Sequence, residues 1–99
     1  MKVETDIFDD PRFVDIPLGE KPFPNEHACR LRPPGRFVRF RRSNCFRRSG
    51  GKCIDYIFGR RQDGNTEVQA MRYKKQAWEA GAARSHCRRR GGSFEAASG

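Results

Sequence analysis

Hydrophobic and polar positions are most regular in two segments that flank a polar turn. Residues 53–59 are rich in β-branched and aromatic side chains, and residues 66–73 alternate between apolar and polar ones. Residues 62–65 contain an Asp-Gly pair, which favours the tight turn of a hairpin. The pattern therefore predicts a β-hairpin. It leaves open whether the buried face of the first strand is the one that holds Ile54, Tyr56 and Phe58.

Residues 76–90 have the composition of a helix. Alanines are frequent, and three arginines occupy the last turn, where cations favour the negative end of the helix dipole. The glycine pair at 91–92 would end this helix. Trp78 lies at helical spacing from small residues, so we interpret it as a core anchor rather than a ligand platform. Residues 93–96 would then return as a third strand.

Three shorter elements are predicted before the hairpin. Asn25 or Glu26 caps a short turn that ends before Pro33, because proline disfavours helical backbone in the residue before it. Residues 36–42 mix apolar and basic positions without clean alternation, which indicates a short strand or an irregular edge. Residues 49–51 are Ser-Gly-Gly and predict a flexible hinge.

Residues 1–24 form an acidic arm that four prolines punctuate, which excludes a long helix or a central strand there. The arm is expected to be extended and partly disordered, either as a solvated tail or as a segment that docks on the basic part of the chain and shields its arginines. The predicted fold class is α+β. Residues 25–97 form a single small domain, in which a small antiparallel sheet (the hairpin plus a third short strand) has one helix packed across it.

Charge is unevenly distributed along the chain, whose formal net charge is +9. Residues 1–26 hold three basic and seven acidic groups, a net charge of −4, whereas residues 27–99 hold 18 basic and five acidic groups, a net charge of +13. Such a basic body indicates an acidic partner: nucleic acid, an anionic membrane surface or an acidic protein face.

Between Arg30 and Lys52 the chain carries nine basic residues and no acidic one, interleaved with three phenylalanines. Guanidinium groups bind phosphates bidentately and stack on bases, and aromatic rings stack on bases in single-strand binders. The alternative is that the phenylalanines belong to the core and the arginines only maintain solubility. The candidate nucleic-acid-binding residues are Arg36, Arg39, Arg41, Arg42, Arg47, Arg48, Lys52, Arg60 and Arg61.

The predicted location of the protein and the spacing of its four cysteines together favour reduced thiols rather than a metal site. No segment approaches the roughly 18 apolar residues of a membrane span, and the acidic start lacks the apolar core of a signal peptide. We therefore expect no membrane partner and a cytoplasmic location, where thiols stay reduced. The cysteines form no tight pair of the kind typical of structural zinc, so no metal and no cofactor are expected. The four are Cys29, Cys45, Cys53 and Cys87.

No catalytic constellation is apparent, and no catalytic residue is assigned. Cys53 and His86 would be the one nucleophile–base pair that helix packing brings together, but nothing supplies an oxyanion hole or an orienting acid. His27 and His86 are interpreted as hydrogen-bonded packing residues. The chain is therefore expected to be non-enzymatic.

Several short segments together resemble a small module of phage and prophage proteins, which occurs alone or fused to head-morphogenesis and prohead-protease proteins. The resemblance spans roughly residues 25–97, and the arginine density of this chain is higher than in the module. It implies a phage or prophage context but no catalytic residues. The segments are residues 27–33, 46–48, 57–60, 69–73, Trp78, residues 86–87 and residues 91–96.

The sequence thus predicts a non-enzymatic phage or prophage accessory protein that binds nucleic acid or another polyanion through an arginine-rich surface. It would act in the host cytoplasm or in association with the virion. The alternative is a structural or assembly module that binds another virion protein and has no nucleic-acid role. The two differ in salt dependence, since phosphate contacts weaken with salt and a hydrophobic interface does not.

Overall fold

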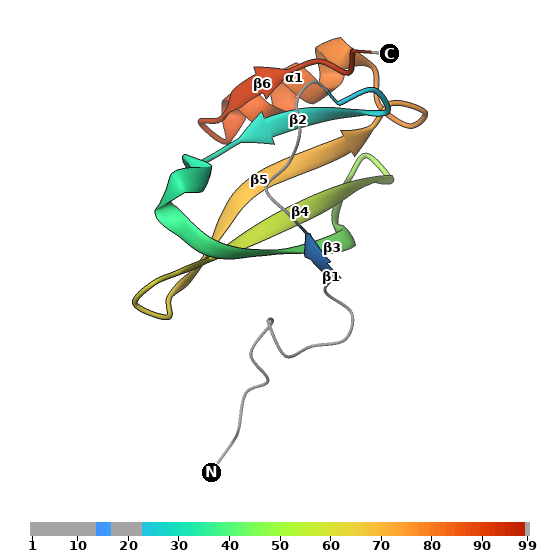
Figure 1. Ribbon diagram of the computed structural model, residues 1–99. Helices are drawn as coiled ribbons and strands as arrows, with labels where there is room; N and C mark the ends of the chain where they lie inside the picture. The colour runs from blue at the N-terminus through green and yellow to red at the C-terminus, as the bar shows by residue number, and fades with distance from the viewer. Residues whose placement is uncertain (1–13, 17–22, 99) are drawn as a thin grey trace.

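The computed structural model describes residues 14–16 and 23–98 of the 99-residue chain (Figure 1). These described residues form one antiparallel sheet and one α-helix, so the α+β class is confirmed, but the sheet has six strands rather than three. Its order is β1-β3-β4-β5-β2-β6. The elements are β1 (Val14–Ile16), β2 (Glu26–Arg30), a 3-10 turn (Pro34–Arg36), β3 (Phe37–Ser49), β4 (Lys52–Arg61), β5 (Thr66–Lys74), α1 (Ala80–Arg89) and β6 (Ser93–Glu95).

The predicted hairpin is confirmed as β4 and β5, which pair antiparallel with one register shift between Ile57 and Phe58. Gly64 in the connecting turn has φ of +92°, a conformation that favours glycine. Successive side chains of β4 point to opposite faces of the sheet. We call the face that carries α1 the helix side and the opposite face the far side. Ile54, Tyr56 and Phe58 are buried in the helix-side core.

The segment before this hairpin forms a second hairpin. The strand predicted over residues 36–42 is longer, because β3 continues to Ser49. The flexible hinge predicted at residues 49–51 is wrong. Gly50 and Gly51 have φ of +57° and +79° and form a two-residue turn that pairs Ser49 with Lys52. Positive φ at both positions is the geometry that matches strand twist in a tight hairpin.

The turn predicted at residues 25–30 is also wrong, since Glu26–Arg30 form β2. This strand lies between β5 and β6 and pairs with both, so neighbours on each side satisfy its backbone groups. Those partners are 40 or more residues away in sequence, and the local cap signal at Asn25 or Glu26 therefore gave no indication of them. The predicted strand at residues 93–96 is confirmed as β6, but it pairs with β2 rather than with the hairpin.

The predicted helix is confirmed but shorter, because α1 begins at Ala80. The amide of Gly92 donates to the carbonyl of Cys87 and that of Gly91 to Arg88, both at 3.0 Å, so the glycine pair ends the helix as predicted. Trp78 precedes the helix and is only 4% exposed, which confirms it as a core anchor. Figure 1 shows α1 beside β6 and β2, toward the edge of the sheet opposite β3.

Two hydrophobic clusters lie on the two faces of the sheet. The larger one, on the helix side, combines Tyr73, Met71 and Trp78 with the helix. The smaller one contains Phe37, Phe40, Ile57 and Ala70 on the far side. The ring of Phe37 lies where a Cβ atom on Gly59 would be, so the glycine permits this packing.

Within the acidic arm, the structure describes β1, which pairs with the outer edge of β3. Its backbone is extended there, as expected. The remaining expectations for residues 1–13 and 17–22 lie outside the described residues. Within the described part of the chain, no helix is long and apolar enough to span a membrane.

The expectation of reduced thiols is wrong, because all four cysteines form disulfides. Cys29 in β2 is bonded to Cys87 in α1, with the Cα atoms 5.6 Å apart, and Cys45 in β3 is bonded to Cys53 in β4, with the Cα atoms 4.6 Å apart. Both separations suit a disulfide. The pairs are 58 and 8 residues apart in sequence, and spacing alone gave no sign of which residues the fold brings together.

Candidate nucleic-acid interface

The register of β3 against β4 places a row of arginines on the helix side. Arg39 is paired with Arg60, Arg41 with Phe58, and Arg47 with Ile54. Residues paired across an antiparallel ladder project to the same face. These arginines therefore share the face of Phe58 and Ile54, and β3 lies toward the edge of the sheet opposite α1.

The helix adds a further cation to this row. A guanidinium nitrogen of Arg90 donates a hydrogen bond of 3.2 Å to the hydroxyl of Tyr56, which brings the C-terminal end of α1 to the middle of β4. Sequence reasoning assigned Arg90 only to the helix dipole and missed it as a site residue. We call the set on the helix side the arginine face: Arg39, Arg41, Arg47, Arg60 and Arg90.

A bulge in β3 turns an aromatic ring onto this face. Between the pairs Ser43–Tyr56 and Arg47–Ile54, three residues of β3 oppose the single residue Asp55. Phe46 lies in the bulge, and its ring centroid is 5.1 Å from that of Tyr56 and 5.0 Å from that of Phe58. The guanidinium of Arg47 lies over the Phe46 ring at 4.2 Å. Cations over aromatic faces attract electrostatically, so this pair is held in place on the arginine face.

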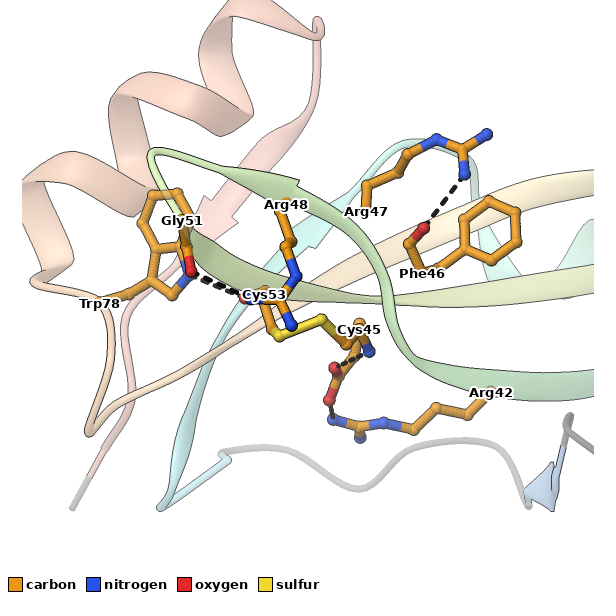
Figure 2. The surroundings of a disulfide bond; sticks show 9 residues. Arg42, Cys45, Phe46, Arg47, Arg48, Gly51, Cys53 and Trp78 are labelled. Carbon is orange, nitrogen blue, oxygen red and sulfur yellow. Dashed lines mark hydrogen bonds and ion pairs between the residues drawn. A yellow bond between two sulfur atoms is a disulfide. The ribbon is translucent and has the colours of Figure 1, made fainter.

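Asp55 holds the bulge from the far side. Asp55 is 2% exposed, and its carboxylate accepts a hydrogen bond of 2.7 Å from the amide of Cys45, which has φ of +52°. The disulfide to Cys53 fixes the same residue covalently. In Figure 2, Phe46 and Arg47 lie on the side of the strands that carries the helix, whereas Arg42 and the Cys45 contacts lie on the other side. The bulge thus connects a far-side anchor to the helix-side surface.

Arg42, one of the predicted site residues, is part of the far-side anchor. Its guanidinium contacts Asp55 at 2.6 Å and Glu26 at 2.7 Å. Burial alone would lower the pKa of Arg42, but hydrogen bonds and charges from Glu26 and Asp55 outweigh it and raise the pKa. Glu26 also pairs with Arg72 at 3.2 Å, and the Arg72 guanidinium lies 4.3 Å from the centre of the Phe23 ring. Arg42 therefore has a structural role.

Two other predicted residues lie at the end of the sheet where β3 begins. Arg36 and Arg61 contact the carboxylate of Glu67 at 3.5 and 3.8 Å, and Arg32 contacts it at 3.3 Å. Arg61 also contacts Asp63 at 3.8 Å. Three guanidiniums thus face two carboxylates, so this corner keeps a surplus of positive charge. These pairs are partly exposed, and each contributes on the order of 1 kcal/mol or less to stability.

The last two predicted residues flank the Gly50-Gly51 turn. A guanidinium nitrogen of Arg48 donates to the Gly51 carbonyl at 3.2 Å, and the Lys52 ammonium lies 4.1 Å from the centre of the Trp78 ring. Since β3 extends 13 residues, at about 3.3 Å per residue, the nine predicted residues do not form one patch. Four belong to the arginine face, and Arg36 and Lys52 lie near its two ends. The register places the other three on the far side: Arg42, Arg48 and Arg61.

Two of the three phenylalanines between the arginines belong to the core, and the third lies at the arginine face. Phe37 and Phe40 are each 7% exposed and pack edge to face at 5.9 Å, so they belong to the core. Phe46 is half-buried and contacts the arginine face.

Neither histidine is arranged for catalysis with a thiol, because Cys53 is in a disulfide. The amide of Ala97 donates to His27 Nδ1 at 2.9 Å, so Nε2 carries the proton that it donates to the Trp78 carbonyl at 3.0 Å. His86 Nδ1 is hydrogen-bonded to the Tyr73 hydroxyl at 2.8 Å. The packing roles predicted for both histidines are confirmed. In the described part of the chain, no three metal-ligating side chains cluster.

Comparisons with known proteins add no family assignment: no protein-family model, curated protein or solved structure matches the chain. The resemblance to a phage module therefore stays a prediction that rests on the short segments given above. The functional argument depends on the geometry and charge of the arginine face.

Proposed function

We propose that this protein is a non-enzymatic accessory protein that binds nucleic acid, without base specificity, through the arginine face. The observation that supports this proposal is the convergence of guanidiniums from three elements on one side of the sheet. Arg39 and Arg41 come from β3, Arg60 from β4 and Arg90 from the end of α1. A phage or prophage context, which the sequence resemblance implies, is part of the same proposal.

The chemistry of the surface favours phosphate contacts over base readout. Guanidinium groups form paired, charge-assisted hydrogen bonds to phosphate oxygens, and none of these contacts depends on sequence. Of the three rings that contact one another, Tyr56 and Phe58 are buried, so only the half-buried Phe46 supports stacking on a base. The ligand is therefore a flexible or duplex polyanion bound mainly by its backbone.

The two disulfides bear on where the protein acts. Disulfides form and persist in oxidising environments, including virion surfaces, and are rare in the reducing cytoplasm. Of the two expected locations, cytoplasmic and virion-associated, the second accords better with four oxidised cysteines.

The test is a salt titration of binding, using fluorescence anisotropy with labelled single-stranded DNA, single-stranded RNA and duplex DNA. The triple variant R39Q/R41Q/R60Q is compared with R30Q/K74Q/K75Q, which removes three exposed cations elsewhere. If each arginine contacts one phosphate of duplex DNA, the slope of log K against log salt falls by about 2.7 for the first variant. The control should keep most of the wild-type slope.

Equal effects of the two triple variants would show that net charge, not the arginine face, determines binding. Circular dichroism and melting temperature verify that each variant is folded. Absence of binding at every salt concentration would reject the proposal and favour the alternative, a module that binds another virion protein.

A further inference from the structure

The acidic arm meets the arginine-rich strand at a defined register. β1 pairs antiparallel with β3, with Val14 opposite Arg42, Asp15 opposite Arg41, and Ile16 opposite Phe40. Among the described residues, the outer edge of β3 has a strand partner only over these three positions, although β3 is 13 residues long. The arm therefore attaches where the arginines of β3 are concentrated.

Charge complementarity accompanies this pairing. β3 carries five arginines and no acidic residue, whereas residues 1–22 carry six acidic and three basic groups. A tethered anionic segment beside a basic strand acts at an effective concentration in the millimolar range. It therefore competes with any anion of the solution that binds the same arginines.

From this register and charge pattern we infer that the arm is a built-in competitor, which lowers the affinity of the arginine face for polyanions until a polyanion displaces it. The inference rests on the proposed function and adds a regulation of the same surface. Three paired residues make a short edge strand, and a two- or three-residue pairing is marginal without further packing. A ligand with many phosphates can displace such a strand, whereas one with few phosphates cannot.

The experiment changes the charge of the arm while the full chain is kept. The variant D10N/D15N removes two negative charges from the arm, at Asp15 in β1 and at Asp10 before it. The matched control D63N/E79Q removes two exposed acids of the domain. Both variants have the same net charge, so a difference between them depends on position. Affinity for a labelled single-stranded DNA at low salt should rise about fivefold for D10N/D15N, the lower end of usual coupling between sites, and less than twofold for the control.

The outcomes separate this inference from the proposed function. If the wild-type chain binds and D10N/D15N behaves like the control, competition by the arm is rejected and the proposed function stands. If no form of the chain binds, the proposed function fails, and the inference fails with it.

A second measurement follows the strand itself. Amide hydrogen exchange of residues 14–16 should accelerate when single-stranded DNA saturates the protein, because displacement breaks the pairing with β3. Unchanged or slower exchange at saturation would overturn displacement. The amides of β4 and β5 serve as internal controls, since their pairing does not involve the arm.

Discussion

Asp55 lies on the far side of the sheet and holds the bulge of β3 that presents Phe46 on the arginine face. It accepts hydrogen bonds from the Cys45 amide and from the Arg42 guanidinium. Without Asp55 the Cys45 amide loses its acceptor, whereas Arg42 keeps its contacts with Glu26 and Asn44. A donor that has lost both its acceptor and its water is costly. The cost of the substitution therefore exceeds that of any exposed ion pair in this molecule.

We expect Asp55→Ala to lower the free energy of unfolding by about 1–3 kcal/mol, the usual cost of leaving a buried donor without its acceptor. Asp55→Asn, which keeps the shape and one acceptor oxygen, should cost less. The control Glu79→Ala concerns an exposed residue whose side chain makes no capping hydrogen bond, and it should stay within about 0.5 kcal/mol of wild type. Urea unfolding followed by tryptophan fluorescence measures all three. A cost for Asp55→Ala close to that of the control would contradict the assigned role.

His86 gives a pH dependence at the same scale. Burial, assisted by the charges of Arg90 and Arg89, lowers the pKa of His86 below its ordinary value of 6.5. The unfolded chain therefore takes up a proton at a higher pH than the folded chain. The stability from neutral His86 is complete above about pH 6.5 and is lost as the pH falls toward the lowered pKa.

The expected result is a lower melting temperature at pH 5 than at pH 7.5, with a smaller decrease in His86→Gln. Glutamine keeps an acceptor for the Tyr73 hydroxyl but does not titrate. Melting curves of both proteins across this range, at constant ionic strength, make the comparison. Identical pH profiles would mean that His86 does not contribute.

At the scale of elements, the junction between α1 and β6 depends on one glycine. A Cβ atom on Gly92 would overlap the Sγ of Cys29 and lie 3.0 Å from the Sγ of Cys87. The disulfide and the start of β6 thus approach each other closely only because residue 92 has no side chain. Gly81, within α1, has nothing within 4 Å of its Cβ position.

We expect Gly92→Ala to destabilise the protein by about 1–3 kcal/mol, the usual cost of overpacking. Gly81→Ala should stabilise it by about 0.4–1 kcal/mol, since alanine restricts the unfolded chain at a helical position. Chemical denaturation of the two variants, which differ from wild type by one methyl group each, is the measurement. Equal effects would show that the contact at Gly92 is not limiting.

Elements with strong local signals could be predicted from the sequence, but the long-range partners of the strands could not. The β4–β5 hairpin and the stop of α1 follow from local composition. β2 carries no comparable signal, because its partners β5 and β6 are distant in sequence. The candidate site was predicted as a run of arginines, but the alternation of β3 against β4 and the position of α1 decide which of them face the same way. Arg42, opposite Ile57, therefore lies on the far side, and Arg90 belongs to the arginine face.

At the scale of the whole molecule, the two disulfides restrain different parts of the chain. The buried Cys29–Cys87 bond joins β2 to α1 and closes a loop of 58 residues, whereas Cys45–Cys53 closes 8 residues within one hairpin. A small domain buries a limited core, so covalent links supply a large part of its stability. In the chain-entropy account, a longer closed loop stabilises more, because the link restricts a larger part of the unfolded chain.

The double variant C29A/C87A should therefore lose about 4 kcal/mol of unfolding free energy, and C45A/C53A about 2.5 kcal/mol, from the loop lengths alone. Urea unfolding without reductant measures both, and wild type with reductant should approach the two losses together.

The shorter link also holds the bulge that carries Phe46 and Arg47, so C45A/C53A should weaken nucleic-acid binding. C29A/C87A should leave binding unchanged at temperatures where the variant is folded. The opposite result would be a larger loss of stability in C45A/C53A and weaker binding in C29A/C87A. It would mean that the bulge does not form part of the arginine face.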